Sequence, residues 1–129
     1  MFTLEQIKIA HEKVQAATDF PIYIQELIDL GVKGYDTMVS DGHVSYYGDD
    51  NYATATNKTY DLIPIAPTAN KERFIEYLVM YQDGQTDYYT FCTDAAKSGI
   101  ANWRIDIIAM TCTYNDSDNN PIVIEKIAM

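Results

Sequence analysis

The residues best suited to chemistry are Asp41 and His43, which flank Gly42. An Asp-Gly pair between two β-like runs is typical of a hairpin turn, so both side chains are expected at one hairpin tip. A histidine beside a carboxylate can act as a base or bind a metal ion. The alternative is an ordinary hairpin turn with a solvated histidine.

Aromatic residues are the most unusual part of the composition, with 11 Tyr, 4 Phe and 1 Trp. A small core cannot bury all of them with every hydroxyl satisfied, so some should reach the surface, where Tyr and Trp favour protein interfaces. Tyr46, Tyr47 and Asp49 lie one strand from the turn, and Trp103 lies in a later predicted strand. We interpret these four as an acidic aromatic binding surface. Strands that are simply rich in aromatic residues would give the same pattern.

No other motif indicates catalysis. Cys92 lies on a predicted buried helix face and Cys112 in a predicted strand, so two reduced and unreactive thiols are expected. The acidic segment 116–120 begins like a calcium loop, but Pro121 and Ile127 stand where that loop requires Gly and Glu. We therefore expect no catalytic residue, no metal and no cofactor.

The charge excludes two classes of partner. The chain has 19 acidic and 9 basic residues, a net charge of −10, and the charge is spread along its length. Such a surface repels phosphate backbones and anionic lipids, so neither nucleic acid nor membrane binding is expected. No apolar run approaches the roughly 18–20 residues that cross a bilayer, and the N-terminus is typical of a helix start, so a cytoplasmic protein is expected. The charge favours solubility or a basic protein partner.

Two helices and a hairpin are predicted in the first half. A capping box at Thr3 and Gln6 opens a helix over residues 3–17, and Asp19 is predicted to cap a second helix that ends at Gly31. The apolar stripes are Leu4, Ile7, His11 and Val14 in the first helix, and Ile24, Leu27 and Ile28 in the second. Strands are expected over residues 32–39, 43–47 and 60–65.

The second half repeats this order. Helices are predicted over residues 71–81 and 87–98, and strands over 103–108, 111–114 and 121–127. An ungapped shift of 68 residues aligns residues 18–50 with 86–118 and gives five identities: Thr18/Thr86, Asp19/Asp87, Gly31/Gly99, Tyr46/Tyr114 and Asp50/Asp118. We predict one α+β domain over residues 1–129 with an antiparallel sheet, built by duplication from units 1–65 and 70–127. Chance similarity between two helix-hairpin units is the alternative.

Unusual sequence blocks also carry a family resemblance. The blocks Gly84-Gln85-Thr86-Asp87-Tyr88 and Met110-Thr111-Cys112-Thr113-Tyr114 resemble the YdfO-like family of small bacterial and prophage-carried proteins, some of which are labelled phage envelope protein. The similarity extends through Phe20-Pro21 and Ser40-Asp41-Gly42 in the first half. The resemblance implies an α+β fold and a prophage-associated history, with no catalytic residue to carry over.

Together these features predict a non-enzymatic protein that binds a protein partner through its acidic aromatic surface, with homodimer formation as a further expectation. The main alternative is an enzyme or small-molecule binder with Asp41 and His43 in a pocket between the two units. A virion structural protein is a third alternative.

Overall fold

The computed structural model describes residues 2–13 and 19–127, which form four helices and an antiparallel six-stranded sheet. The strands lie in the order β3-β2-β1-β4-β5-β6. The helices are α1 (Leu4–Glu12), α2 (Phe20–Leu30), α3 (Lys71–Gln82) and α4 (Tyr88–Lys97). The strands are β1 (Gly34–Met38), β2 (Val44–Tyr47), β3 (Ala53–Ala55), β4 (Asn102–Asp106), β5 (Thr111–Asn115) and β6 (Pro121–Lys126). The predicted α+β class and antiparallel sheet are confirmed.

The capping box at Thr3 and Gln6 forms as predicted, but the Asp19 side chain makes no capping hydrogen bond to α2. The side chain of Thr3 accepts the N–H of Gln6 at 3.2 Å, and that of Asp87 accepts the N–H of Thr90 at 2.8 Å. Gly31 ends α2 at φ +92°, in the left-handed region that favours glycine. Among the described helices, none is both long and apolar enough to cross a membrane.

Parts of the predicted helix stripes were wrong. Ile24 and Leu27 are fully buried, but Ile28 is 41% exposed, because one helix contacts the sheet through a narrower face than its apolar content suggests. His11 is also exposed, with its ring edge-on to Tyr23 at 5.3 Å. The end of the first predicted helix, including Val14, lies outside the described residues.

The predicted strand over residues 60–65 does not form. The N–H of Ile63 donates to the carbonyl of Ser40, and the Tyr60 hydroxyl donates to the carbonyl of Val39. These bonds tie the segment to the end of the β1–β2 hairpin, not along the side of β2. The place beside β2 belongs instead to β3, which lies in a segment where no strand was predicted.

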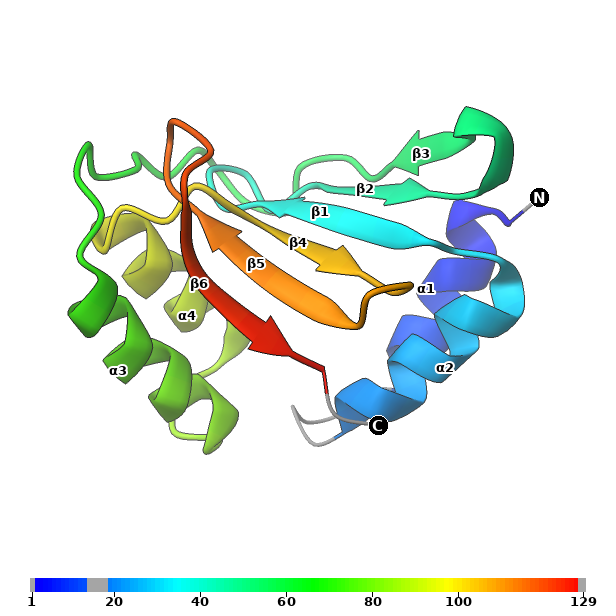
Figure 1. Cartoon of the computed structure of the whole chain (residues 1–129), viewed down its shortest axis with the longest axis horizontal. Helices are drawn as coiled ribbons and strands as arrows, with labels where there is room; N and C mark the ends of the chain where they lie inside the picture. The colour runs from blue at the N-terminus through cyan, green and yellow to red at the C-terminus, as the bar shows by residue number, and fades with distance from the viewer. Residues whose placement is uncertain (1, 14–18, 128–129) are drawn as a thin grey trace.

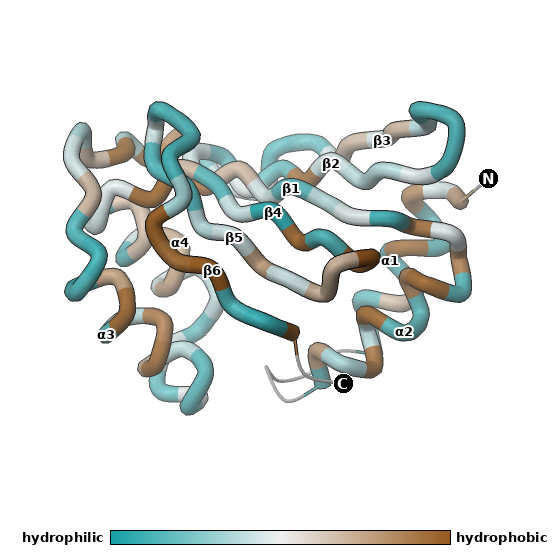
Figure 2. The backbone as a smooth tube through the Cα atoms, in the orientation of Figure 1, coloured by the Kyte–Doolittle hydropathy of each residue, from teal (hydrophilic) through white to brown (hydrophobic). Residues whose placement is uncertain are grey.

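All four helices lie on one face of the sheet, α1 and α2 towards one end and α3 and α4 towards the other (Figure 1). Hydrophobic and hydrophilic residues alternate along the helices and several strands (Figure 2), as expected for elements with one buried side. The core lies between the helices and the inner face of the sheet, where Tyr35, Tyr46, Trp103, Ile105 and Tyr114 are buried.

The two halves of the sheet share one geometry. Gly34 pairs with Tyr47 in the first hairpin, and Asn102 pairs with Asn115 in the second. Both residues of the second pair lie 68 positions after their counterparts in the first. At the centre, β1 pairs with β4, and the middle pair of that ladder is Asp36 with Arg104, which are 68 residues apart.

Candidate functional site

The candidate site is the face of the sheet opposite the helices, here called the open face. Because successive residues of a strand point to opposite sides of the sheet, the residues next to the buried ones along each strand point outward. None of the described helices lies on this side (Figure 1). The four inner strands present mostly polar side chains here: Asp36, Met38, Ser45, Tyr47, Asn102, Arg104, Asp106, Thr111, Thr113 and Asn115.

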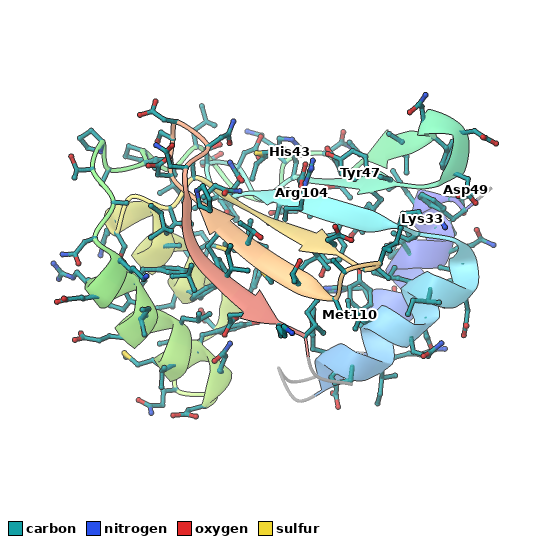
Figure 3. The ribbon with its side chains drawn as sticks, viewed as in Figure 1. Lys33, His43, Tyr47, Asp49, Arg104 and Met110 are labelled. Carbon is teal, nitrogen blue, oxygen red and sulfur yellow. The ribbon has the colours of Figure 1, made fainter. Side chains whose placement is uncertain are left out.

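Asp36, Arg104 and Tyr47 are bonded together at the centre of the open face. The Arg104 Nε donates to Asp36 Oδ1 at 2.7 Å, and one terminal nitrogen donates to Oδ2 at 2.9 Å. The Tyr47 hydroxyl donates to the same Oδ2. The guanidinium also lies over the Tyr47 ring, 5.5 Å from its centroid. Figure 3 shows Arg104 and Tyr47 together above the sheet, so the arginine and the ring hold each other in place.

Electrostatics keep Asp36 ionised. Its side chain is only 13% exposed, and this burial by itself would raise the pKa of the carboxyl group. The hydrogen bonds from Arg104 and Tyr47, together with the charge of Arg104, outweigh burial and lower the pKa. Burial and the bond to Asp36 raise the pKa of the Tyr47 hydroxyl. The group therefore presents a carboxylate, a guanidinium and a neutral phenol.

Asp41 and His43 lie together in the turn before β2. Asp41 Oδ1 lies 2.6 Å from His43 Nδ1 and accepts the His43 backbone N–H at 3.0 Å. This backbone bond is the main reason that the pKa of Asp41 is lowered. Both side chains are partly exposed. The carbonyl of Asp41 accepts the N–H of Thr59, so the turn is fixed by the segment that follows β3.

Asp49 lies at the other end of β2 from His43. It pairs with Lys33 at 3.4 Å, and its side chain is 74% exposed. The four residues of β2 span roughly 13 Å, so Asp49 and the Asp41–His43 turn lie at opposite ends of the strand and do not form one cluster. Figure 3 shows Asp49 and Lys33 above α1, at the far end of the sheet from His43.

Tyr46 and Trp103 belong to the core. Tyr46 is 6% exposed and its hydroxyl lies 3.2 Å from that of Tyr23, while Trp103 is 7% exposed. They occupy the inner face, on the opposite side of the sheet from Tyr47. Neither can contact a partner on the open face, and only Tyr47 and Asp49 of the expected aromatic surface remain available.

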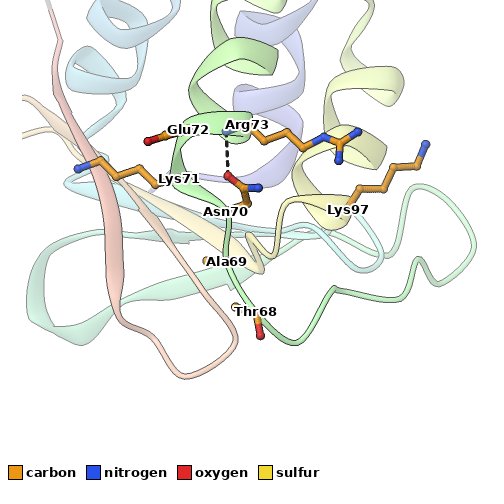
Figure 4. A pocket seen from close by; sticks show the side chains of 7 residues that line it. All are labelled: Thr68, Ala69, Asn70, Lys71, Glu72, Arg73 and Lys97. Carbon is orange, nitrogen blue, oxygen red and sulfur yellow. Dashed lines mark hydrogen bonds between the residues drawn. The ribbon is translucent and has the colours of Figure 1, made fainter.

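Two hollows in the described surface are lined by neither the Asp41–His43 turn nor the group of Asp36, Arg104 and Tyr47. One, of about 580 Å³, lies at the start of α3, where Arg73 and Lys97 extend to one side and Lys71 to the other (Figure 4). The basic side chains do not converge on one point. The other, of about 230 Å³, is lined by Phe2, Leu30, Gly31, Asp49 and Tyr52. Within residues 2–13 and 19–127, no three His, Cys, Asp or Glu side chains are grouped to hold a metal ion.

Comparison with known protein families gives a match. A family model described as a protein of unknown function, DUF1398, matches residues 8–126. The chain belongs to this family. The match runs from within α1 to the last residue of β6, so it includes every strand of the sheet. No curated protein matches the chain.

Two central residues of this DUF1398 chain, Asp36 and Arg104, were missed by sequence reasoning. Each is a charged residue inside a predicted strand, and each is the counterpart of the other under the 68-residue shift. A charged side chain in the middle of a strand must face solvent or an opposite charge. Two such residues at equivalent positions of the two halves were therefore the signal in the sequence for this ion pair.

Proposed function

We propose that this protein acts by binding a protein partner on the open face, with Tyr47 and Arg104 as its anchors. The observation that carries the proposal is the bonded group of Asp36, Arg104 and Tyr47 at the centre of an uncovered sheet face. Tyrosine and arginine dominate the energetic centres of protein interfaces. Here both are already fixed, so less side-chain entropy is lost on binding.

The charge of the chain favours a protein partner over nucleic acid. The net charge is −10, and within the inner strands of the open face Arg104 is accompanied by the acidic Asp36 and Asp106. A phosphate backbone requires several clustered cations. A protein surface that carries a carboxylate beside an apolar residue would fit the remaining guanidinium nitrogen and the Tyr47 ring.

The test is capture from host lysate with tagged wild-type protein, followed by affinity measurement on the purified captured protein. Tyr47→Ala should weaken binding about 30-fold or more, as expected for loss of a central anchor. Tyr77→Ala is the matched control, because Arg73 stacks on Tyr77 at 5.7 Å in a similar exposed pair on α3. A captured protein that binds Tyr47→Ala and wild type equally would refute the proposal.

The second candidate function is a small-molecule binder or enzyme at Asp41 and His43. The close Asp41–His43 contact favours it, because a carboxylate that holds Nδ1 leaves Nε2 free to accept a proton. A ligand screen by NMR should then shift the His43 ring signals, and the shifts should vanish in Asp41→Asn. Hits that leave these signals unmoved would exclude the site.

We also propose that residues 1–65 and 70–127 arose by duplication and form one domain. The equal register of the two hairpins supports this, as do the paired left-handed residues Gly31 and Gly99, and Asn51 and Asn119. The resemblance to the YdfO-like family supports a prophage-associated origin, and a cytoplasmic location stays a prediction from the sequence. Expression of the two halves as separate chains tests the first point, since similar units should reassociate into the native fold.

A further inference from the structure

No described residue forms a backbone hydrogen bond with the outer edge of β6. The N–H of Ile127 donates to the carbonyl of Met110, so these two residues form a hydrogen-bonded pair that continues the β5–β6 ladder. Bonded pairs alternate along an antiparallel ladder, so residues 125 and 123 also face β5. The N–H and C=O groups of Ile122, Ile124 and Lys126 therefore point away from the sheet.

This edge differs from the opposite one. The other edge strand, β3, has only three residues, whereas β6 has six. Of the features that can oppose edge pairing in β6, Pro121 and the irregularity at Tyr114/Asn115 lie at the start of the strand, and the charged Lys126 lies at its end. The next three residues, Ile122 to Ile124, are apolar, and the charged Glu125 and Lys126 follow them (Figure 2); Ile124 is 63% exposed. An exposed apolar edge of this kind is a template for another strand.

A second copy of β6 fits this edge. In antiparallel pairing about a two-fold axis at Ile124, each Ile124 faces its own copy and Ile122 faces Lys126 of the second copy. Such pairing uses the free backbone groups of both strands and covers the exposed isoleucine. Glu125 does not oppose it, because the Tyr114 hydroxyl at 3.1 Å and the Gln82 side chain hold its carboxylate on the other face.

Charge complementarity supports the same occupant. Lys126 is exposed and forms no ion pair with any described residue, in a chain that is otherwise strongly acidic. The turn before β6 carries Asp116 and Asp118. Antiparallel pairing brings Lys126 to the start of the second copy's β6, beside that acidic turn. A parallel arrangement would set like charges together instead.

We propose that the protein is a homodimer in which two β6 strands pair antiparallel about Ile124 to form one continuous sheet. The proposal is independent of the binding function assigned to the open face. The dimer would double that face, since the helices of both copies would lie on the same side of the joined sheet.

The test is light scattering after size exclusion, over a concentration series at fixed salt. Wild type should have twice the chain mass of 14.6 kDa. Ile124→Pro removes only an N–H that points away from β5, so the monomer should remain folded while the dimer dissociation constant rises roughly 10- to 100-fold. Ala55→Pro is the matched control on the β3 edge, where the outward N–H is also lost, and it should remain dimeric.

A second variant guards against misfolding of the first. Ile124→Lys places two like charges opposite each other at the axis and should also give a monomer with an unchanged circular dichroism spectrum. Monomeric wild type at every concentration would overturn the proposal. A dimer that persists in both Ile124 variants, or one that dissociates in Ala55→Pro, would overturn it as well.

Discussion

Replacement of Arg104 by methionine tests the central group of the open face. Arg104→Met keeps an unbranched stem over the Tyr47 ring but removes both hydrogen bonds to Asp36. The carboxylate, only 13% exposed, then keeps the Tyr47 hydroxyl as its remaining donor in the group. A mostly buried charge that loses its counter-charge is destabilising.

The magnitude follows from burial. A hydrogen bond to a charged group contributes about 1.5–3 kcal/mol to the free energy of unfolding. Here the contribution is smaller, because the Arg104 side chain is 59% exposed and solvent screens its charge. We therefore expect the free energy of unfolding at pH 7 to fall by about 1–2 kcal/mol. For a domain of this size, that loss lowers Tm by roughly 3–8 °C.

The effect of Arg104→Met on the free energy of unfolding should depend on pH through the ionisation of Asp36. The pKa of Asp36 is lowered in the folded protein, so its stabilising effect is present above the unfolded-state pKa and is lost as pH falls through the folded-state pKa. Without Arg104, burial raises that pKa. The difference in stability between wild type and Arg104→Met should therefore be largest near neutral pH and shrink towards zero in acid. Urea unfolding followed by circular dichroism at several pH values measures it.

Asp49→Asn is the matched control. Asp49 pairs with Lys33 at 3.4 Å with both side chains well exposed, so its loss should cost less than about 0.5 kcal/mol. Equal stability of Arg104→Met and wild type at pH 7, or a difference that does not change with pH, would refute the reasoning.

Three further predictions concern the core. Leu27→Ala should destabilise the fold by about 3 kcal/mol, whereas Ile28→Ala, at a 41% exposed position, should cost under about 1 kcal/mol in urea unfolding. Gly99→Ala should cost more than Gly31→Ala, because a Cβ at residue 99 would lie 2.5 Å from a backbone oxygen while residue 31 has open space and only left-handed strain; calorimetry should rank the two Tm values accordingly. Burial raises the pKa of Cys112 to about 12, so at pH 8 this thiol should react with a disulfide reagent only after denaturant is added, and fast labelling of the native protein would contradict its burial.

Local signals in the sequence were enough to locate most helices and strands. Gly31 and Gly99 ended their helices as predicted, because a left-handed terminal residue depends on neighbours along the chain. The strand expected over residues 60–65 does not form, because the segment bonds to the end of a hairpin and packs Tyr60, Ile63 and Ile65 against the core instead. Tyr60 and Ile63 attach the segment to the end of a hairpin, a contact between distant parts of the chain that no local pattern specifies.

The site was harder to predict for the same reason. Tyr46 and Tyr47 are adjacent, and strand geometry requires that they face opposite sides, but the sequence does not show which side the helices cover. Asp36 and Arg104 meet only because β1 pairs with β4 at one register. That pairing joins residues 68 apart, so the contact could be inferred only by combining their mid-strand charges with the 68-residue shift.

The position of Asp36 opposite Arg104 has a consequence for how such a sheet can be assembled. The two residues occupy equivalent places in the two hairpins and face each other at the middle of the β1–β4 ladder. In a sheet made from two identical chains, a residue at that place would meet its own twin, and aspartate would repel aspartate. A single polypeptide is free to differ at its two central positions, so it can place opposite charges where a symmetric pair of chains never could.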